Sequence, residues 1–222
     1  MVALINSFSA MIIIYSLLFI IALVVILIFS SKRFSPIPFF PTNKYDLPLI
    51  IKSLDLKNNQ VIFDLGAGDG IVIFEASKEA YRKKLNTKFI AVEINPILII
   101  LLHLRHFFHP NKKNIKIILA DLFTMSLRAL AKQSRNYEIA SLLTSFTPRN
   151  DKIIMKPRQT WLTQFNNITI YLYISPWFLD KVTKKVLKEI PKARIVSYMY
   201  PIKSLRHKEK LIKGKNFVFI YS

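Results

Sequence analysis

Three of the four glycines in this chain fall within five residues, at Gly66, Gly68 and Gly70. They follow an apolar run, residues 61–63, and the acidic residue Asp64. A chain with so little glycine is expected to cluster it where the backbone turns tightly or lies close to another group. The pattern therefore predicts a buried strand followed by a glycine-rich loop, the place where α/β proteins bind ligands at the carboxyl end of a first parallel strand.

The residue types in this loop argue against two common ligands. A dinucleotide fingerprint needs glycine at position 71, which is Ile71, and the loop does not continue into the Gly-Lys-Ser/Thr of a phosphate-binding loop. It carries two carboxylates instead, Asp64 and Asp69. Because carboxylates repel phosphate and attract cations, the loop suits a cationic or amine-bearing ligand.

Two further apolar runs also lead to acidic residues. Residues 88–92 precede Glu93, and residues 115–120 precede Asp121. The carboxyl ends of parallel strands meet at one edge of a sheet, so we expect these acids to lie near Asp64. A carboxylate at the Glu93 position can accept hydrogen bonds from both hydroxyls of a ribose.

An uncharged apolar run, residues 10–29, lies near the N-terminus. Twenty helical residues span about 30 Å, the hydrocarbon thickness of a bilayer. No Lys or Arg precedes the run and no Ala-x-Ala site follows it, which favours a membrane anchor, residues 1–33, over a cleaved signal peptide. Lys32 and Arg33 follow it, so the positive-inside rule predicts a single-pass protein with a cytoplasmic body and the N-terminus outside.

The three strand ends together resemble the class I S-adenosylmethionine-dependent methyltransferases, whose first motif is an acidic residue followed by G-x-G-x-G. The resemblance implies an α/β, Rossmann-like sheet with helices on both faces, here preceded by one transmembrane helix. It implies S-adenosyl-L-methionine as cofactor, whose sulfonium and α-amino groups agree with the acidic loop. It also implies that Glu93 binds the ribose, that Asp121 lies against the adenine amino group and that Phe123 packs on the ring. The implied cofactor-binding residues are Asp64, Gly66, Ala67, Gly68, Asp69, Glu93, Asp121 and Leu122.

Two further segments narrow the resemblance. Pro38-Phe39-x-Pro41-Thr42 precedes an amphipathic pattern that predicts a short helix, and the second strand continues as Glu93-Ile94-Asn95-Pro96. Both resemble the membrane-anchored lysine methyltransferases related to ATP synthase c-subunit lysine N-methyltransferase. That resemblance implies that Pro41 and Thr42 border the substrate cleft and that the acceptor is a lysine amine of a small membrane protein. The alternative interpretation of Pro41 and Thr42 is a rigid spacer with a helix cap.

The fourth predicted strand, residues 167–177, would end beside the transferring methyl group in such a fold. Enzymes that methylate adenine N6 or cytosine N4 carry Asn/Asp-Pro-Pro-Tyr there, whereas this chain has Tyr173-Ile174-Ser175-Pro176, which disfavours methylation of nucleic-acid bases. Tyr171 and Tyr173 are expected on one face of the strand and Leu172 on the other. By the resemblance, Tyr173 is a candidate for orienting the acceptor amine, and Ser175 and Pro176 border the cleft.

The rest of the chain completes the predicted domain organisation. A Pro-rich linker and short helix, residues 34–56, precede a methyltransferase domain, residues 57–222. A helix is expected to open at Phe178, and strands are expected at residues 193–201 and 217–221; the spacing leaves little room for more, so we expect a trimmed sheet of six strands.

Residues from about 126 to 156 interrupt this pattern. They resemble peptides encoded by mobile palindromic repeats that insert in frame into genes, which places an insertion at about 126–160. The alternatives are an ordinary family-specific loop or a substrate-binding lid. Long surface insertions are tolerated because the entropy of loop closure grows slowly with length, so an insertion predicts a protruding segment outside the core.

The charge of the chain points to the membrane surface rather than to nucleic acid. The net charge is +20, and residues 181–215 hold twelve Lys and Arg against Glu189 and Glu209. Each basic residue near an anionic leaflet contributes about 1 kcal/mol, and no aromatic–basic RNA-binding motif is visible. The chain has no Cys, and His103, His106 and His109 lack a neighbouring carboxylate or Cys, so we expect no metal site.

The apolar N-terminal run and the two resemblances together imply a membrane-anchored enzyme that transfers a methyl group from S-adenosylmethionine to a lysine amine of a membrane protein. The sulfonium methyl is already activated, so the enzyme has to align the reacting atoms and exclude water. Desolvation favours the neutral form of a lysine amine, so no general base is assigned. The alternatives are a methyltransferase acting on a lipid or small molecule, and an inactive remnant that carries an insertion.

Overall fold

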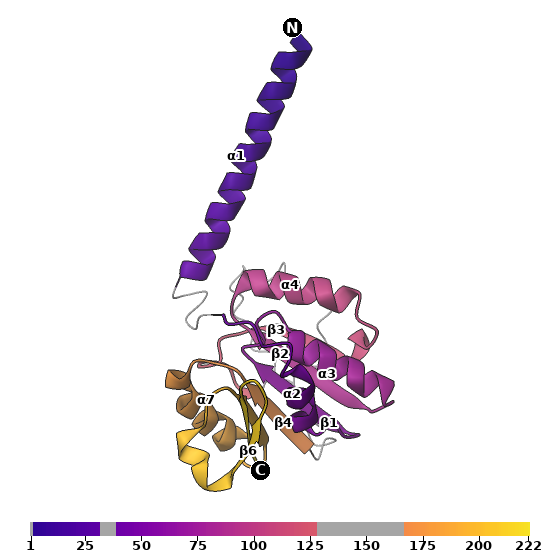
Figure 1. Ribbon diagram of the computed structural model, residues 1–222, viewed down its shortest axis with the longest axis vertical. Helices are drawn as coiled ribbons and strands as arrows, with labels where there is room; N and C mark the ends of the chain where they lie inside the picture. Colours follow the sequence, from indigo (N-terminus) through magenta and orange to yellow (C-terminus); the bar gives the residue numbers. More distant parts are fainter. Residues whose placement is uncertain (1, 32–38, 128–166) are drawn as a thin grey trace, which may run out of the picture.

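The computed structural model describes residues 2–31, 39–127 and 167–222 (Figure 1). Three sequence predictions fall outside this part of the chain: the insertion at about 126–160, apart from its first two residues, the basic pair Lys32 and Arg33, and Pro38. They stay predictions.

A seven-stranded sheet forms the centre of the domain. Its strand order is β3-β2-β1-β4-β5-β7-β6, and every neighbouring pair is parallel except β5–β7 and β6–β7. The strands are β1 (Gln60–Leu65), β2 (Thr87–Glu93), β3 (Ile115–Leu119), β4 (Asn167–Leu172), β5 (Arg194–Tyr198), β6 (Glu209–Lys213) and β7 (Phe217–Tyr221). The chain builds outward from β1 to β3 and then returns to the other side of β1 with β4, so the topological switch lies between β1 and β4. The predicted α/β, Rossmann-like sheet is confirmed.

The central strands are buried on both faces, as the continuous apolar runs predict for a parallel sheet covered by helices. All six residues of β1 are buried. Successive residues of β4 enter opposite layers of the core: Tyr171 packs in one cluster and Leu172 in the other. The alternation predicted for Tyr171, Leu172 and Tyr173 is therefore confirmed.

Helices cover both faces of the sheet. One face packs against α2 (Leu47–Leu54), α3 (Ile71–Arg82) and α4 (Pro96–Phe107), and the other against α7 (Pro176–Glu189). Two short 3-10 helices, η1 (Lys112–Asn114) and η3 (Lys203–Lys208), connect neighbouring elements. In Figure 1, α4 lies at the end of the domain nearest to the N-terminal helix, and α7 lies across the sheet from α3.

The short helix α2 is held against the sheet by a buried carboxylate at its N-terminus. Asp46 accepts hydrogen bonds from the Tyr198 hydroxyl at 2.7 Å and from the backbone amides of Lys215 at 2.6 Å and Asn216 at 2.9 Å. Burial by itself would raise the pKa of Asp46, but these hydrogen bonds outweigh it and hold the pKa below its usual range. Helix α2, which follows the anchor and precedes β1 in the sequence, therefore packs as part of the domain.

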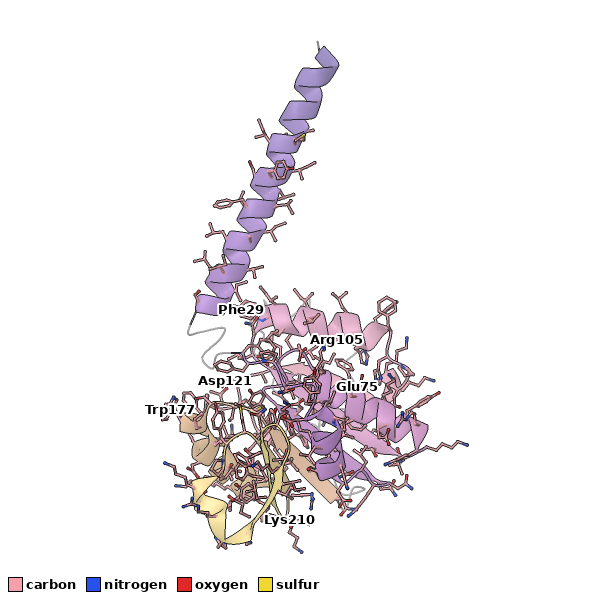
Figure 2. The ribbon with its side chains drawn as sticks, in the orientation of Figure 1. Phe29, Glu75, Arg105, Asp121, Trp177 and Lys210 are labelled. Atoms are coloured by element: carbon pink, nitrogen blue, oxygen red, sulfur yellow. The ribbon has the colours of Figure 1, made fainter. Side chains whose placement is uncertain are left out.

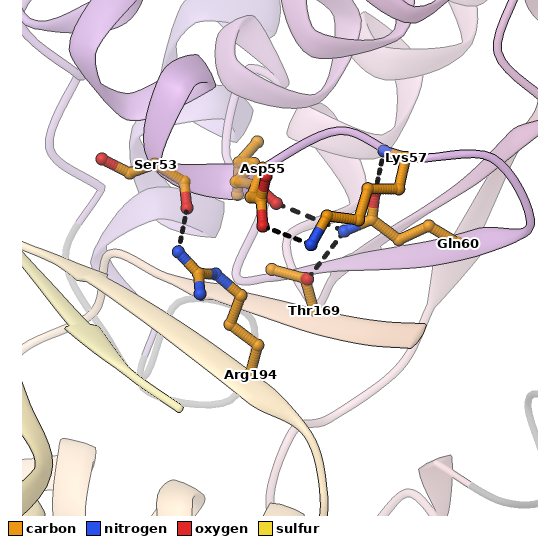
Figure 3. A network of polar contacts seen from close by, with 7 residues as sticks. Ser53, Asp55, Lys57, Gln60, Thr169 and Arg194 are labelled. Carbon is orange, nitrogen blue, oxygen red and sulfur yellow. Dashed lines mark hydrogen bonds and ion pairs between the residues drawn. The ribbon is translucent and has the colours of Figure 1, made fainter. Parts of the chain in front are cut away.

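A second polar network fixes the C-terminus of α2 at the opposite end of the strands (Figure 3). Arg194 donates to the Ser53 carbonyl at 3.2 Å. Gln60 donates to the Thr169 hydroxyl at 2.9 Å and accepts from the Lys57 amide at 2.8 Å. These bonds join the amino ends of β1 and β4 and attach the amino end of β5 to α2, away from the glycine-rich loop.

The N-terminal helix α1 (Val2–Ser30) stands apart from the domain (Figure 1). Its segment Ala10–Ser30 is long and apolar enough to cross a membrane, and none of it is buried against the domain. This agrees with the predicted anchor by length and composition. The side of the membrane on which the domain lies stays a prediction.

The structure corrects three predictions about the second half of the sheet. A seventh strand, β6, was missed, and the trimmed sheet of six strands is wrong. Strand β4 ends at Leu172 rather than at residue 177, and α7 begins at Pro176 rather than at Phe178. Proline has a fixed φ and no amide hydrogen, so it is favoured in the first turn of a helix and ends the extended segment there.

Candidate functional site

A pocket opens at the carboxyl ends of β1, β2 and β4, beside the topological switch. Its outline holds about 760 Å³ of space between the surrounding atoms, part of which is open solvent at the mouth. The loops after β1, β2, β3 and β4 and the segment before α2 all contribute to it. Its lining is Phe39, Phe40, Thr42, Asp64, Gly66, Ala67, Gly68, Asp69, Ile71, Val72, Glu93, Ile94, Leu98, Asp121, Leu122, Phe123, Tyr171, Tyr173 and Ile174.

The glycine-rich loop forms the floor of the pocket in a conformation that side chains disfavour. Gly68 has a φ of 58°, and a Cβ built there would lie 2.6 Å from the Phe39 ring. The amides of Gly66 and Ala67 both donate to the Val92 carbonyl at 2.9 Å. The loop is thereby bound to the neighbouring strand β2, and the segment before α2 closes over it.

Glu93 connects the ends of β1 and β2. One carboxylate oxygen, Oε1, accepts from the amides of Ile94 at 2.8 Å and Asn95 at 2.9 Å, and the other, Oε2, accepts from the Gly68 amide at 2.8 Å. A carboxylate has about four acceptor positions, so three are occupied and the fourth lies on Oε2. A ribose held through two hydroxyls therefore requires one of these backbone amides, such as that of Gly68, to be released.

Asp64 is the most deeply buried acid of the site, with 3% of its surface exposed. Burial raises the pKa of its carboxyl well above the usual range, and the nearby charges of Glu93 and Asp69 raise it further. A cation bound beside Asp64 would favour the ionised form. The pocket therefore gains most from a ligand that brings positive charge to this position.

Tyr171 is the neighbour of Asp64 in the sheet, since the two residues are paired in the register of β1 and β4. Its hydroxyl is buried and has no hydrogen-bond partner among the described residues, although the Thr42 side chain lies near enough to lower its pKa in part. Burial raises the Tyr171 pKa well above its usual range, and the charge of Asp64 adds to this. Buried hydroxyls are nearly always paired, so this one is available to a polar atom of a ligand.

The other two acids lie nearer the rim of the pocket. Asp69 accepts from the Ile71 amide at 3.3 Å, and Arg105 binds both its carboxylate, at 3.2 Å, and its carbonyl, at 2.6 Å. Asp121 follows β3 and accepts from the Phe123 amide at 2.8 Å, which closes a turn and brings the Phe123 ring to the pocket.

The charge of the pocket is opposite to that of the chain. Four carboxylates line it, from Asp64, Asp69, Glu93 and Asp121, and no Lys or Arg belongs to the described lining. The whole chain carries a net charge of +20. The site therefore attracts cations and disfavours phosphate groups, in agreement with the prediction from the loop sequence.

The structure brings most of the predicted site residues together, but three lie elsewhere. The eight candidate cofactor-binding residues line the pocket, as do Thr42 and Tyr173. Pro41 is exposed, and Pro176 is exposed at the start of α7. Ser175 caps the same helix outside the pocket lining, because β4 ends early and the chain turns into α7.

Tyr173 lies between the pocket and the aromatic core. Its hydroxyl donates to the Met199 sulfur at 3.4 Å, and its ring packs edge-on against Tyr198 with centroids 4.8 Å apart. Burial raises the pKa of Tyr173, with a further contribution from Tyr200. A thioether is a weak acceptor, so a bound polar group can compete for this hydroxyl.

Several residues of the pocket were not predicted from the sequence. Phe40, Ile94, Leu98 and Ile174 line it. The sequence indicated these four residues only indirectly, because each of them lies within a few residues of a predicted motif.

Two of the three histidines considered as metal ligands contact the backbone: His106 near the end of α4 and His109 just after it. The Nε2 atoms of His106 and His109 lie 3.0 Å from the carbonyls of Lys112 and Phe74, respectively. Within the described residues, no three His, Cys, Asp or Glu side chains gather as metal ligands.

Comparison with known proteins identifies the fold. No protein-family model matches the chain, and no curated protein matches its sequence. An RNA methyltransferase from Salinibacter ruber, solved with S-adenosyl-L-homocysteine, is similar in structure, with a TM-score of 0.54 and 15% identity over 82% of this chain and 92% of that chain. An uncharacterized protein from Listeria monocytogenes serotype 4b has a TM-score of 0.51 and 9% identity over 82% of this chain and 68% of that chain. At these identities the likeness shows the fold alone: the domain shares a Rossmann-like fold with these two proteins, one of which is a methyltransferase.

Proposed function

We propose that this protein is a membrane-anchored methyltransferase that uses S-adenosylmethionine and methylates a lysine amine of a membrane protein. The observation that carries the proposal is the acidic pocket at the topological switch of the sheet. Four carboxylates converge there on a chain with a net charge of +20, without a basic residue in the described lining. Such a lining fits a cationic ligand better than a phosphate-bearing one.

The residues present fit the cofactor. Bound S-adenosylmethionine would supply a methyl group activated by a sulfonium cation. Glu93 has a remaining acceptor position for a ribose hydroxyl, and Asp64 offers negative charge for the cationic part of the ligand. Asp121 and Phe123 lie at the side of the pocket expected to hold the adenine. The Tyr171 hydroxyl, which has no hydrogen-bond partner among the described residues, is a further polar group that a ligand can contact.

The remaining lining explains how an amine acceptor would be handled. A lysine has an unperturbed pKa of about 10.4 and has to lose a proton before it attacks. The lining also includes the apolar side chains of Phe39, Phe40 and Ile174. An apolar environment favours the neutral form of an amine that enters the pocket. The Tyr173 hydroxyl can accept an N–H of that amine and so direct its lone pair toward the methyl group.

The choice of a membrane protein as acceptor depends on the anchor. If Ala10–Ser30 spans the bilayer, the domain stays within a short tether of the membrane surface. An acceptor fixed in the same membrane would then meet the pocket at high effective concentration. A lipid or small molecule is the alternative acceptor, and RNA is included in the test because one structural neighbour is an RNA methyltransferase.

The test is methyl transfer from labelled S-adenosylmethionine by the full-length chain in membranes that lack it. Label is measured separately in protein, lipid and RNA, and labelled protein is hydrolysed to identify the methylated residue. We expect one small membrane protein to carry label on lysine, and Glu93→Gln to abolish the signal while Glu79→Gln on α3 retains it. Label in lipid or RNA would refute the lysine acceptor but keep the enzyme, whereas absence of label in all fractions despite cofactor binding would indicate an inactive remnant.

A further inference from the structure

Helix α4 presents an apolar face that the domain leaves uncovered. Ile100, Leu104, Phe107 and Phe108 are exposed by 60%, 58%, 66% and 81%, respectively. Their spacing of four, three and one residues places them along one side of the helix and its end, while Leu102 on the inner side is fully buried. We call these four exposed residues the α4 face.

The α4 face is a continuous apolar surface with aromatic residues at one end. The rings of Phe107 and Phe108 pack edge to face, with centroids 4.9 Å apart, and both remain mostly in solvent. Single exposed apolar residues are common in soluble proteins, but four on one helix form a patch of the kind that contacts a partner or a membrane.

Basic side chains lie beside the α4 face, and one of them, Arg105, pairs with the carboxylate of Asp69. Between Glu93 and Asp121 the chain has no acidic residue. Arg105, Lys112 and Lys113 are exposed beside the face, and the Lys112 ammonium lies 5.4 Å from the centre of the Phe107 ring. Helices with an apolar face, aromatic residues and a basic rim bind at the interface of anionic membranes.

The path of the chain places the α4 face close to the anchor. The last described residue after α1 is Ser31, and the chain re-enters the described domain at Phe39, against Gly68. Eight extended residues reach at most about 29 Å, so Phe39 and the glycine-rich loop beneath it stay within about that distance of Ser31. Next to Gly68, the carbonyl of Asp69 accepts a hydrogen bond from Arg105 of α4.

Figure 2 shows the same relation: Phe29, at the end of α1, lies on the side of the domain where α4 lies, and side chains of α4 point outward there. Lys210 of β6 lies at the opposite end of the molecule (Figure 2). The anchor and the α4 face therefore belong to the same side of the protein.

We propose that α4 lies in the headgroup region of the bilayer, with the α4 face against the acyl chains, as a second membrane contact beside α1. The inference rests on the proposed anchoring of this protein. Ile94 and Leu98, at the start of α4, line the pocket, so docking of α4 holds the pocket mouth at the membrane surface. It limits the acceptor to amines at the level of the lipid headgroups, such as a lysine that borders a membrane-spanning segment.

The chain has no cysteine, which makes single-site labelling direct. Leu104→Cys and Phe107→Cys carry an environment-sensitive fluorophore in the full-length protein, reconstituted in vesicles of phosphatidylcholine and phosphatidylglycerol. Leu211→Cys on β6 is the matched control, because Leu211 is also an exposed leucine, with 51% of its surface free. Leu18→Cys in α1 reports insertion of the anchor. Each label is tested against a spin-labelled lipid and against iodide in the water.

Docking predicts that labels at positions 104 and 107 lose most of their emission to the lipid quencher and resist iodide, while the label at 211 behaves in the opposite way. Quenching by iodide alone at 104 and 107 would overturn the proposal. Resistance to both quenchers would also overturn it, since a second copy or another part of the chain would then cover the face. The label at Leu18→Cys distinguishes membrane insertion of α1 from docking of α4. If the lipid quencher does not reach this label, the proposal that α1 anchors the protein is refuted. If the lipid quencher reaches it but does not reach the label at position 104, only the docking of α4 is refuted.

Discussion

Replacing Glu93 by glutamine tests the site at the residue on which the glycine-rich loop depends. The Glu93 carboxylate accepts three backbone hydrogen bonds, from Gly68, Ile94 and Asn95, all between 2.8 and 2.9 Å. Glutamine has the same shape but only one acceptor oxygen. If that oxygen keeps Ile94 and Asn95, the new NH₂ group faces the amide of Gly68, donor against donor.

The magnitude follows from these three bonds. Hydrogen bonds to a charged group contribute about 1.5–3 kcal/mol each and neutral ones about 1 kcal/mol, while an unpaired buried donor costs about 1–3 kcal/mol. Two weakened bonds and one lost bond give about 3–5 kcal/mol, which movement of the loop reduces to about 2–4 kcal/mol. This cost lowers the free energy of unfolding of Glu93→Gln. Affinity for S-adenosylmethionine falls as well, because the NH₂ group cannot accept a hydrogen bond from a ribose hydroxyl. Loss of one hydrogen bond to a charged acceptor, about 1.5–3 kcal/mol, weakens binding by about 10- to 150-fold.

The assay is calorimetric titration of the full-length protein in detergent with S-adenosylmethionine, alongside a denaturant titration for stability. Glu79→Gln is the control, because Glu79 pairs with Arg82 and Lys83 on the surface of α3, away from the pocket. We expect unchanged affinity in the control. Affinity of Glu93→Gln within about twofold of the unmodified protein, a difference of about 0.4 kcal/mol, would refute the role of this carboxylate.

Three further changes test other parts of the account. Gly70→Ala should lower the free energy of unfolding by about 2–5 kcal/mol in a urea titration, because φ is 76° and a Cβ would contact Leu102 and lie 2.7 Å from the Phe74 ring; a change below about 1 kcal/mol would contradict this. Affinity for S-adenosylmethionine should rise as pH increases through the raised pKa of Asp64, because the cation binds the ionised carboxylate and displaces its proton; calorimetry should show the rise weakened in Asp64→Asn, and an equally steep rise in the variant would assign it to another group. Tyr171→Phe should leave the stability of the protein without cofactor unchanged or higher, since the hydroxyl has no hydrogen-bond partner in the described part of the chain, while affinity for the cofactor falls several-fold; unchanged affinity in the same titration would remove this hydroxyl from the site.

The first half of the sheet was predictable because its signals are local. An apolar run followed by an acid or by glycines marks a strand end wherever it occurs, and β1, β2 and β3 all end within two residues of such a mark. Strand β6 gave no such signal. It is a short edge strand with charged residues, such as Lys210 and Lys213, and such strands look like surface loops in a sequence.

The candidate site was predictable in its residue types but not in its bonding. That Glu93 holds the amide of Gly68 depends on how β1 and β2 pair, and that Phe39 covers the loop depends on the path of the chain before α2. The resemblance implied Pro41 for the cleft, yet Phe39 and Phe40 line the pocket while Pro41 is exposed. A sequence pattern locates such a segment but does not tell which of its side chains turn inward.

The α4 face illustrates the same limit. The first two turns of α4 are apolar on every side, from Pro96 to Leu102, so periodicity does not indicate which side packs on the sheet. In the structure, the side of α4 that carries Leu98, Ile99 and Leu102 is buried, and Ile100 is exposed.

The central claim is that the acidic pocket selects a cationic nucleoside ligand. The most direct test is equilibrium binding of labelled S-adenosylmethionine to the purified full-length protein, with S-adenosylhomocysteine, NAD and ATP as competitors. The account predicts saturable binding that S-adenosylhomocysteine displaces and that NAD and ATP, with their phosphate groups, do not. Displacement by NAD or ATP at similar concentrations, or no binding of S-adenosylmethionine, would contradict the account.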